Sequence, residues 1–465
     1  MAHLLVGLRM AVSHLREVAR VTATTDAGGI VSTFQPDSMD EAVASIRPVD
    51  ELGVPLGPGH PIGLLHALGA RDDWEDLTVA GALLTDLYDL FTKPTVRFLS
   101  GFFGPIERGY RDAGFNIEFV PADFRRFAPV LEAQAPRVMA TAAALPDAAG
   151  WMSLSLHAGA TVDELHRAGA DPDRVLIVEV SPHFPRTLGL GPYSHRMHVD
   201  ECDFVVETDR SPVALPDPEP SEIDRAIAGF ATGYISDGST IQTGIGSIPS
   251  TIAKLLVEGD GGDYGIHSEM FTSGLKLLHD SGKVTNNAKG IFQGYSITTF
   301  AAGNQGLYDW LNDRDDVRFL PVHVVNSAEV IANNANMVSI NGAMSIDLFG
   351  QVVADTIDGK QFSGIGGHEE FVSGSGLELS DRSLICLPST ATIDGQLRSR
   401  ITATLMAGSV VTTPRHHLDV VCTEYGAAEM QGRTVRERAA ALAEIAHPDF
   451  RDELFEAAAG MGRGR

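Results

Sequence analysis

The sequence predicts an α/β fold with two open, mostly parallel β-sheets covered by helices. In both halves of the 465-residue chain, short β-rich runs alternate with segments of helical spacing. Runs such as 175–180 (VLIVEV) are apolar on both faces, which is typical of a parallel strand between two layers of helices. A polar stretch with four prolines, 211–222, separates the two halves, because proline interrupts both helix and strand.

The individual elements follow from these patterns. In the first half we expect strands within 74–83, 115–121, 173–180 and 202–209. In the second half we expect strands within 239–246, 263–269, 296–301, 317–323, 336–342 and 383–388. Helical spacing predicts helices over 272–281 and 433–446.

The proline-rich stretch also sets the domain division. We place an N-terminal extension at 1–36, a first α/β domain at 37–217 and a second at 218–465. Ser221 is suited to cap the first helix of the second domain, with Asp224 three residues on. The first 20 residues are too charged for a signal peptide and too short to span a membrane.

The composition narrows the function classes. Lys and Arg total 35 against 61 Asp and Glu, and this formal net charge of -26 argues against nucleic-acid binding. A site for an anionic ligand therefore has to rely on local donors. The three cysteines are far apart and form no CxxC, which argues against disulfides or a zinc ribbon and favours a reducing cytoplasm.

The first candidate site is the segment 239–256, STIQTGIGSIPSTIAKLL. A strand runs into Gly244 and Gly246, and a helix begins near Pro249. Glycines allow close backbone approach and a helix N-terminus favours anions, but an ordinary strand–helix turn explains the pattern equally well.

The second candidate is Glu269, at the end of a predicted strand and just before a helix. In open α/β sheets, ligands bind at the carboxyl ends of strands, which would place this carboxylate at the rim of a cleft. The alternative is an acidic residue that complements the dipole of the following helix, and such residues are common.

The third candidate is the loop that contains Gly364, Gly366 and Gly367. Successive glycines let backbone N–H groups converge on one oxygen, as an oxyanion hole requires, although glycine clusters also form simple flexible turns. His368 and the two glutamates after it are expected to begin a helix.

The fourth candidate is Asn341, after a short apolar strand. Its amide could donate to a substrate oxygen or could cap a turn. The segment that follows predicts a hairpin turning at Phe349 and Gly350.

The absence of other motifs argues against a zinc protease, a P-loop protein and a serine hydrolase with a nucleophile elbow. The chain has no HExxH, GxxxxGK[ST] or GxSxG motif. His416 and His417 are adjacent, which in a strand would point their rings apart and make a poor metal site. We interpret four scattered histidines as surface residues or as core residues with satisfied hydrogen bonds: His157, His183, His195 and His198.

Seven segments in order resemble the acetyl-CoA hydrolase/transferase family, close to its 4-hydroxybutyrate CoA-transferase type. They are 177–187, 244–249, 265–275, 337–352, 362–374, 410–426 and 433–454. Two segments depart from the family's usual form: GGHEEF stands at 366–371, and the EVSPHFPRT segment at 179–187 is altered.

The resemblance implies two related α/β domains with the active site between them, usually in a homodimer. Glu269 matches the catalytic glutamate, while Gly366 and Asn341 match positions that bind CoA or polarise the thioester carbonyl. Coenzyme A is a substrate, and no metal or other cofactor is implied. The implied CoA contacts are Gly244, Gly246, Ser247, Ile248, Pro249, Ser250, Gly364, Gly366 and Gly367.

The resulting hypothesis is a cytoplasmic CoA-transferase that acts between an acyl-CoA and a short-chain carboxylate of the acetate, butyrate or 4-hydroxybutyrate type. A carboxylate is a suitable nucleophile because its acyl adduct is an anhydride, which stays activated, and a glutamyl-CoA thioester would then carry CoA. An acyl-CoA hydrolase using the same glutamate remains an alternative. A non-catalytic protein that binds CoA or a sugar phosphate is an alternative of another class.

Overall fold

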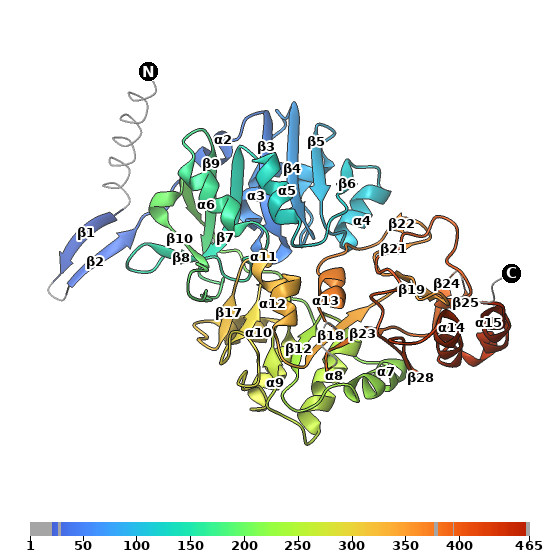
Figure 1. Cartoon of the computed structure of the whole chain (residues 1–465). Helices are drawn as coiled ribbons and strands as arrows, with labels where there is room; N and C mark the ends of the chain where they lie inside the picture. The colour runs from blue at the N-terminus through green and yellow to red at the C-terminus, as the bar shows by residue number, and fades with distance from the viewer. Residues whose placement is uncertain (1–20, 27–28, 376–379, 394, 462–465) are drawn as a thin grey trace.

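The computed structural model describes residues 21–26, 29–375, 380–393 and 395–461. Figure 1 shows two sheets, one in each half of the chain, with helices packed against them. The predicted α/β class with two open, mostly parallel sheets is confirmed.

The first sheet has seven strands, all parallel, in the order β11-β9-β7-β3-β4-β5-β6. Its strands are β3 (Val49–Leu56), β4 (Asp76–Ala82), β5 (Val96–Ser100), β6 (Ile117–Phe119), β7 (Val138–Ala144), β9 (Val175–Ser181) and β11 (Phe204–Glu207). The helices around it are α2 (Met39–Ala44), α3 (Ile62–Gly69), α4 (Pro105–Asp112), α5 (Phe127–Gln134) and α6 (Val162–Ala170).

Alternation along β9 explains why this sheet is covered on both faces. Ile177 belongs to the hydrophobic cluster that includes α2, α3 and α4. Its neighbours Leu176 and Val178 belong to the cluster that includes α5 and α6. Because successive side chains point to opposite faces, an apolar run with both faces buried needs two helical layers.

The second sheet has six strands in the order β13-β12-β18-β23-β27-β28, and only the β27–β28 pair is antiparallel. Its strands are β12 (Thr240–Thr243), β13 (Gly265–Ile266), β18 (Met337–Gly342), β23 (Arg382–Cys386), β27 (Val420–Thr423) and β28 (Gly426–Glu429). One face packs on α7 (Glu222–Thr232), α8 (Ser247–Glu258), α9 (Ser273–Asp280) and α10 (Gln305–Leu311), and the other on α14 (Val435–Glu444) and α15 (Pro448–Gly460).

Short elements complete the described chain. The helices are α11 (Val322–Val325), α12 (Ala328–Ala332) and α13 (His368–Gly374). The strands are β1 (Val21–Asp26), β2 (Gly29–Phe34), β8 (Trp151–Ser153), β10 (Arg196–His198), β14 (Met270–Phe271), β15 (Ser296–Thr298), β16 (Phe300–Ala301), β17 (Val317–Phe319), β19 (Ser345–Asp347), β20 (Val352–Val353), β21 (Thr356–Ile357), β22 (Lys360–Gln361), β24 (Thr390–Ile393), β25 (Gln396–Ser399) and β26 (Ile401–Thr402).

The segment between the two sheets agrees with the proline pattern. It contains neither helix nor strand from 208 to 221, where we place the domain division. Ser221 caps α7 as expected, since its hydroxyl accepts from the Asp224 N–H at 3.1 Å and the Asp224 carboxylate accepts from the Ser221 N–H at 2.8 Å. The hairpin predicted at Phe349 and Gly350 is also present, between the antiparallel strands β19 and β20.

Of the predicted N-terminal extension, residues 1–20 lie outside the described part of the chain. Strands β1 and β2 pair with each other and stand apart from the first sheet in Figure 1. Within the described residues, every helix is too short or too polar to cross a bilayer.

The cysteines and the histidine pair complete the comparison with the sequence. Cys202, Cys386 and Cys422 are buried, and none of them forms a disulfide within the described residues, as expected. The strand geometry considered for His416 and His417 does not apply: they lie in a turn, and their ring centroids are 4.3 Å apart. A turn does not alternate side chains between two faces, so the two rings are not forced apart.

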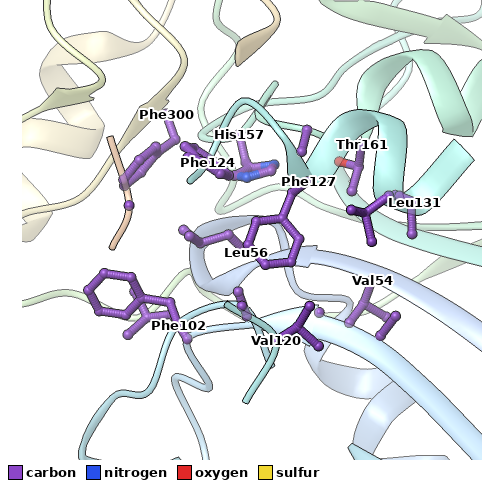
Figure 2. A pocket seen from close by; sticks show the side chains of 18 of the residues that line it. Val54, Leu56, Phe102, Val120, Phe124, Phe127, Leu131, His157, Thr161 and Phe300 are labelled. Atoms are coloured by element: carbon purple, nitrogen blue, oxygen red, sulfur yellow. The ribbon is translucent and has the colours of Figure 1, made fainter. Parts of the chain in front are cut away.

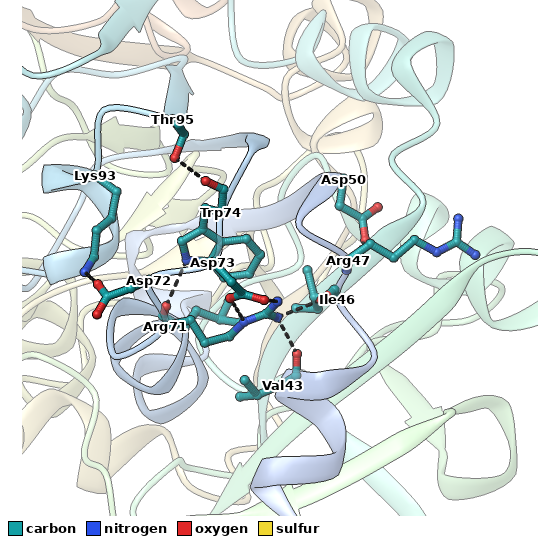
Figure 3. A network of polar contacts seen from close by, with 11 residues as sticks. Val43, Ile46, Arg47, Asp50, Arg71, Asp72, Asp73, Trp74, Lys93 and Thr95 are labelled. Carbon is teal, nitrogen blue, oxygen red and sulfur yellow. Dashed lines mark hydrogen bonds and ion pairs between the residues drawn. The ribbon is translucent and has the colours of Figure 1, made fainter.

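A polar network lies beside the amino ends of β3 and β4, at one edge of the first sheet (Figure 3). The Arg71 guanidinium donates to the Val43 and Ile46 carbonyls at 2.9 and 2.7 Å. It also pairs with Asp73 at 2.8 Å and lies 4.0 Å from the centre of the Trp74 ring. Arg71 thereby ties the end of α2 to the residues that follow α3.

This geometry predicts a stability effect. Arg71→Ala should lower the free energy of unfolding by about 2 kcal/mol, because the two carbonyls lose a buried donor. Urea denaturation measures the change. Arg97→Ala serves as the control, since Arg97 is exposed and makes only a 3.4 Å contact with Thr78. An effect of equal size in both variants would contradict the role of Arg71.

Candidate active site

Glu269 lies at the carboxyl edge of the second sheet, between β13 and β14. Its backbone carbonyl accepts from the Thr299 and Phe300 N–H groups at 3.0 and 3.2 Å. The preceding Ser268 hydroxyl donates to the Thr243 carbonyl at 3.1 Å, which ties this segment to the end of β12. The predicted position at a strand end is therefore confirmed, and three hydrogen bonds hold this segment in place.

The Glu269 side chain does not lie in the first turn of the following helix, where it would complement the helix dipole. Helix α9 is preceded by Thr272 and has no acidic residue in its first turn. The Glu269 carboxylate instead accepts a hydrogen bond from the Asn326 side-chain amide at 2.6 Å and contacts the backbone N–H of Gly367. Of the two interpretations of Glu269, the geometry favours a site residue.

The glycine loop lies directly against this carboxylate. A Cβ atom added at Gly367 would be 2.0 Å from Glu269 Oε2, so only glycine fits there. Gly366 has φ +56°, in the left-handed region that favours glycine. A Cβ atom at Gly364 would be 2.8 Å from the Gly101 carbonyl oxygen, so this end of the loop packs against the first half of the chain.

A second contact confirms that the site lies between the two halves. The Phe124 N–H, from the first half, donates to the Gly366 carbonyl at 2.9 Å. Glu269 thus sits where the carboxyl edge of the second sheet meets residues of the first half.

Asn326 and Glu370 are site residues that the sequence did not single out. Asn326 is fully buried at the end of α11, and its amide donates to both Glu269 and Glu370, at 2.6 and 2.5 Å. Glu370 also accepts from the Arg125 backbone N–H at 3.1 Å and lies 3.4 Å from the Arg125 guanidinium. An asparagine after a short helix carries no sequence signal of its own, whereas Glu370 was visible as part of the unusual GGHEEF stretch.

Burial controls the ionisation of both carboxyl groups. Loss of solvent raises the pKa of Glu269 to about 7, although the Asn326 and Gly367 hydrogen bonds act in the opposite direction. Burial, together with the nearby Glu269 charge, raises the pKa of Glu370 to about 9. At neutral pH Glu370 is therefore mostly protonated, and the carboxylate form of Glu269 is well populated.

The other predicted residues share this sheet edge but do not contact Glu269 in the described hydrogen bonds. Gly244 and Gly246 follow β12, and Ser247, Ile248, Pro249 and Ser250 form the first turn of α8. The helix begins two residues before the expected Pro249, because Gly246 with φ +135° takes the capping position.

Asn341 lies within β18 rather than after it. Its amide faces Gln242 on the neighbouring strand β12, at 3.4 Å. The structure thus places Asn326, and not Asn341, against Glu269, while the predicted role of Asn341 in carbonyl binding stays a prediction.

The four scattered histidines separate into two groups. His183 and His198 have partners, as expected, whereas His195 bonds to the Ser155 carbonyl at 2.8 Å through Nε2 and its buried Nδ1 has no partner in the described structure. His157 differs, because it is buried and neither of its ring nitrogens has a hydrogen-bond partner in the described structure. Its interpretation as a surface or satisfied core residue was wrong, because the chain fold places it in the wall of a cavity.

That cavity opens from Glu269 into the first half of the chain. Figure 2 shows rings of Phe102, Phe124, Phe127 and Phe300 around it, together with His157. Glu269, Met270 and Gly366 line it at the seam between the halves. We call this cavity the apolar chamber, and its residues come from strand ends and helices that only the tertiary structure brings together.

Comparisons with known proteins point in one direction. Residues 303–458 match the acetyl-CoA hydrolase/transferase C-terminal domain family. The chain is 34% identical to succinyl-CoA:cyclohexane-1-carboxylate CoA transferase of Geobacter metallireducens, over 91% of this chain and 94% of that protein. It is 38% identical to 4-hydroxybutyrate coenzyme A transferase of Clostridium kluyveri, over 67% of this chain and 69% of that protein.

The fold comparison agrees. The crystal structure of RipA from Yersinia pestis superposes with a TM-score of 0.83 at 31% sequence identity. The match covers 91% of this chain and 97% of that one.

The first prediction from the site concerns the ionisation of Glu269. Its carboxyl group should titrate near pH 7 rather than near 4.5, because burial disfavours the charged form. Infrared difference titration of the chain against a Glu269→Gln variant isolates this group. A midpoint near 4.5 would show that water reaches the carboxylate.

The second prediction concerns the donor that holds it. Asn326→Leu should move the Glu269 midpoint to higher pH, because a hydrogen bond to the ionised form is lost. The same titration measures the shift. Asn341→Leu is the matched control and should leave the Glu269 midpoint in place. A shift in that variant alone would show that Asn341, and not Asn326, donates to Glu269.

Proposed function

The chain belongs to the acetyl-CoA hydrolase/transferase family and is a CoA-transferase, and we propose that Glu269 carries CoA between an acyl-CoA and a short-chain carboxylic acid. One observation carries the proposal. The Glu269 carboxylate is held by a buried amide and a glycine loop at the head of an apolar chamber between the two halves.

The first half-reaction begins at the thioester. The ionised Glu269 carboxylate attacks the acyl carbonyl carbon, the C–S bond breaks, and a mixed anhydride and CoA thiolate form. The thiolate then attacks the Glu269 carboxyl carbon of the anhydride. The original acyl group leaves as a carboxylate, and Glu269 is left as a glutamyl-CoA thioester.

The second half-reaction reverses these steps with another acid. The incoming carboxylate attacks the glutamyl carbonyl carbon and releases CoA thiolate, which forms a second mixed anhydride. The thiolate attacks the acyl carbon of that anhydride, so a new acyl-CoA leaves and Glu269 returns as a carboxylate. No net proton transfer is required, because carboxylates and thiolate exchange one negative charge.

The residues around Glu269 suit these steps. Each attack on the Glu269 carboxyl carbon places negative charge on its oxygen, and the Asn326 amide already donates to Oε2. The Gly367 N–H contacts the same carboxylate, and we propose the Gly366 N–H and the Asn341 amide as donors to the acyl oxygen. One such donor typically stabilises the transition state by ~3 kcal/mol.

A protonated Glu370 fits this scheme. An ionised Glu370 would add a second negative charge at Asn326, next to the developing oxyanion. Because its pKa is raised, the Glu370 side chain is protonated at neutral pH and that repulsion is absent. An oxygen of its carboxyl group still accepts from the Asn326 amide and holds Asn326 in place.

The CoA moiety needs donors beside the carboxyl edge of the second sheet. We propose that it lies along residues 244–250, where the turn after β12 and the first turn of α8 are partly exposed. The N-terminus of this 12-residue helix favours anionic groups, in a chain whose overall charge opposes them. Remote binding there would orient the thioester toward Glu269.

The cellular setting belongs to the same proposal. Three buried cysteines with no disulfide among the described residues fit a reducing compartment such as the cytoplasm. We propose a homodimer, which sedimentation equilibrium measures directly.

The central test is covalent. After incubation with acyl-CoA, borohydride should trap the glutamyl thioester at Glu269, and peptide mass spectrometry should locate it there. Glu269→Gln should lose the label and reduce CoA transfer by at least ~10³-fold, because an amide cannot form the anhydride. Hydroxylamine provides an independent trap.

Glu369→Gln is the matched control, since Glu369 bonds to Thr413 rather than to Glu269. It should retain both the label and the activity. A label on another residue, or a fully active Glu269→Gln variant, would overturn the mechanism. CoA release that proceeds without any added carboxylic acid would identify a hydrolase with the same nucleophile.

A further inference from the structure

We infer that the acyl group accepted at Glu269 is uncharged, mainly apolar and about as large as a six-membered ring, so that neither acetate nor a dicarboxylate is a preferred substrate. The inference rests on the proposed function of Glu269. It follows from the shape, the lining and the charges of the apolar chamber.

The chamber begins at the nucleophile and runs along the first sheet. Its lining includes Glu269 and Met270 from the second half of the chain, and Val54 on β3 and Leu131 on α5 from the first half. An acyl group bound with its carbonyl carbon beside Glu269 therefore extends into the first half of the chain. The chamber is the volume that the acyl substituent has to occupy.

The walls are aromatic and close-packed. A Cβ atom added at Gly101 would be 2.2 Å from the Phe127 ring, so that ring lies directly on the backbone. The Phe124 and Phe300 rings meet edge to face, with centroids 5.9 Å apart (Figure 2). Fixed rings of this kind set a definite size limit for an occupant.

The volume fits a compact apolar group. The chamber encloses about 100 Å³. An apolar cavity of roughly 150 Å³ in another protein takes up benzene, so the space here admits an apolar group of ring size at most. An acetyl group would leave most of it empty, and its apolar walls would gain few contacts with the ligand.

The charges of the lining exclude a second carboxylate. Among the described residues that line the chamber, none is Lys or Arg. Burial lowers the pKa of His157 to about 3, so its ring is neutral, and Thr161 is uncharged. A dicarboxylate would therefore bury an unpaired negative charge near Glu269, which is strongly unfavourable.

Two polar groups remain in the chamber wall without partners. Both ring nitrogens of His157 and the hydroxyl of Thr161 are buried and lack hydrogen bonds in the described structure. They offer hydrogen bonds but no compensating charge, so they suit an uncharged acyl group with a polar atom better than a second carboxylate.

The experiment compares acceptors with one acyl donor. With acetyl-CoA as donor, we measure kcat/KM for cyclohexanecarboxylate, succinate and isotopically labelled acetate. Cyclohexanecarboxylate should exceed both other acids by at least about tenfold, because it fills the chamber without burying a charge. Equal or higher values for acetate or succinate would overturn the inference.

A pair of variants tests whether the chamber causes the preference. Ala160 is 8% exposed and lines the chamber, so Ala160→Leu fills part of it. This variant should lower kcat/KM for cyclohexanecarboxylate by at least about tenfold and change that for acetate less than about threefold. Ala133→Leu, at an exposed position on α5 outside the lining, should leave both values unchanged.

The outcomes separate the two proposals. If Glu269 is labelled and acetate or succinate is the better acceptor, the proposed function stands and the inference on the acyl group fails. If no acid accepts CoA and Glu269 is never labelled, the proposed function fails and the inference fails with it. If Ala160→Leu does not fold, the ranking of acceptors by the unmodified chain still decides the question.

Discussion

One buried amide group organises the candidate active site. Asn326 donates to Glu269 and Glu370 at once, so two carboxyl groups from distant parts of the second half converge on the same nitrogen. This arrangement is tolerable only when the pair carries little negative charge, and burial raises the pKa of both groups accordingly. Glu269, the proposed nucleophile, is therefore fixed in position by a neutral donor, and no salt bridge to it is found among the described residues.

The seam between the two halves completes this arrangement. The glycine loop at 364–367 contacts Glu269 on one side and the first half of the chain on the other. Further along the seam, Arg108 donates to the Phe362 carbonyl at 2.5 Å and Arg111 contacts the Gln361 carbonyl. Because the loop is held from both sides, its N–H groups are already in position before a substrate binds, which is what electrostatic stabilisation of an oxyanion requires.

The electrostatics of the molecule are local rather than global. A net charge of -26 repels an anionic substrate at long range, yet the site needs only a few N–H donors and a helix N-terminus to oppose that field. The acyl side of the site uses no charge at all, since the chamber is lined mainly by aromatic and aliphatic side chains. In the proposed function, binding of CoA and selection of the acid are separated between the two halves of the chain.

The sequence by itself determined the two parallel sheets, the strand that ends before Glu269, the glycine loop and the cap at Ser221, because these depend on periodicity and on residue preferences at short range. It could not identify Asn326, which meets Glu269 across 57 residues, or the unsatisfied His157 in the chamber wall. It also pointed to Asn341 as the amide that donates to a substrate oxygen, although that side chain faces Gln242. Which side chains meet, and what space they enclose, was decided only by the packing of the two halves, because contacts between distant segments leave no local pattern in the chain.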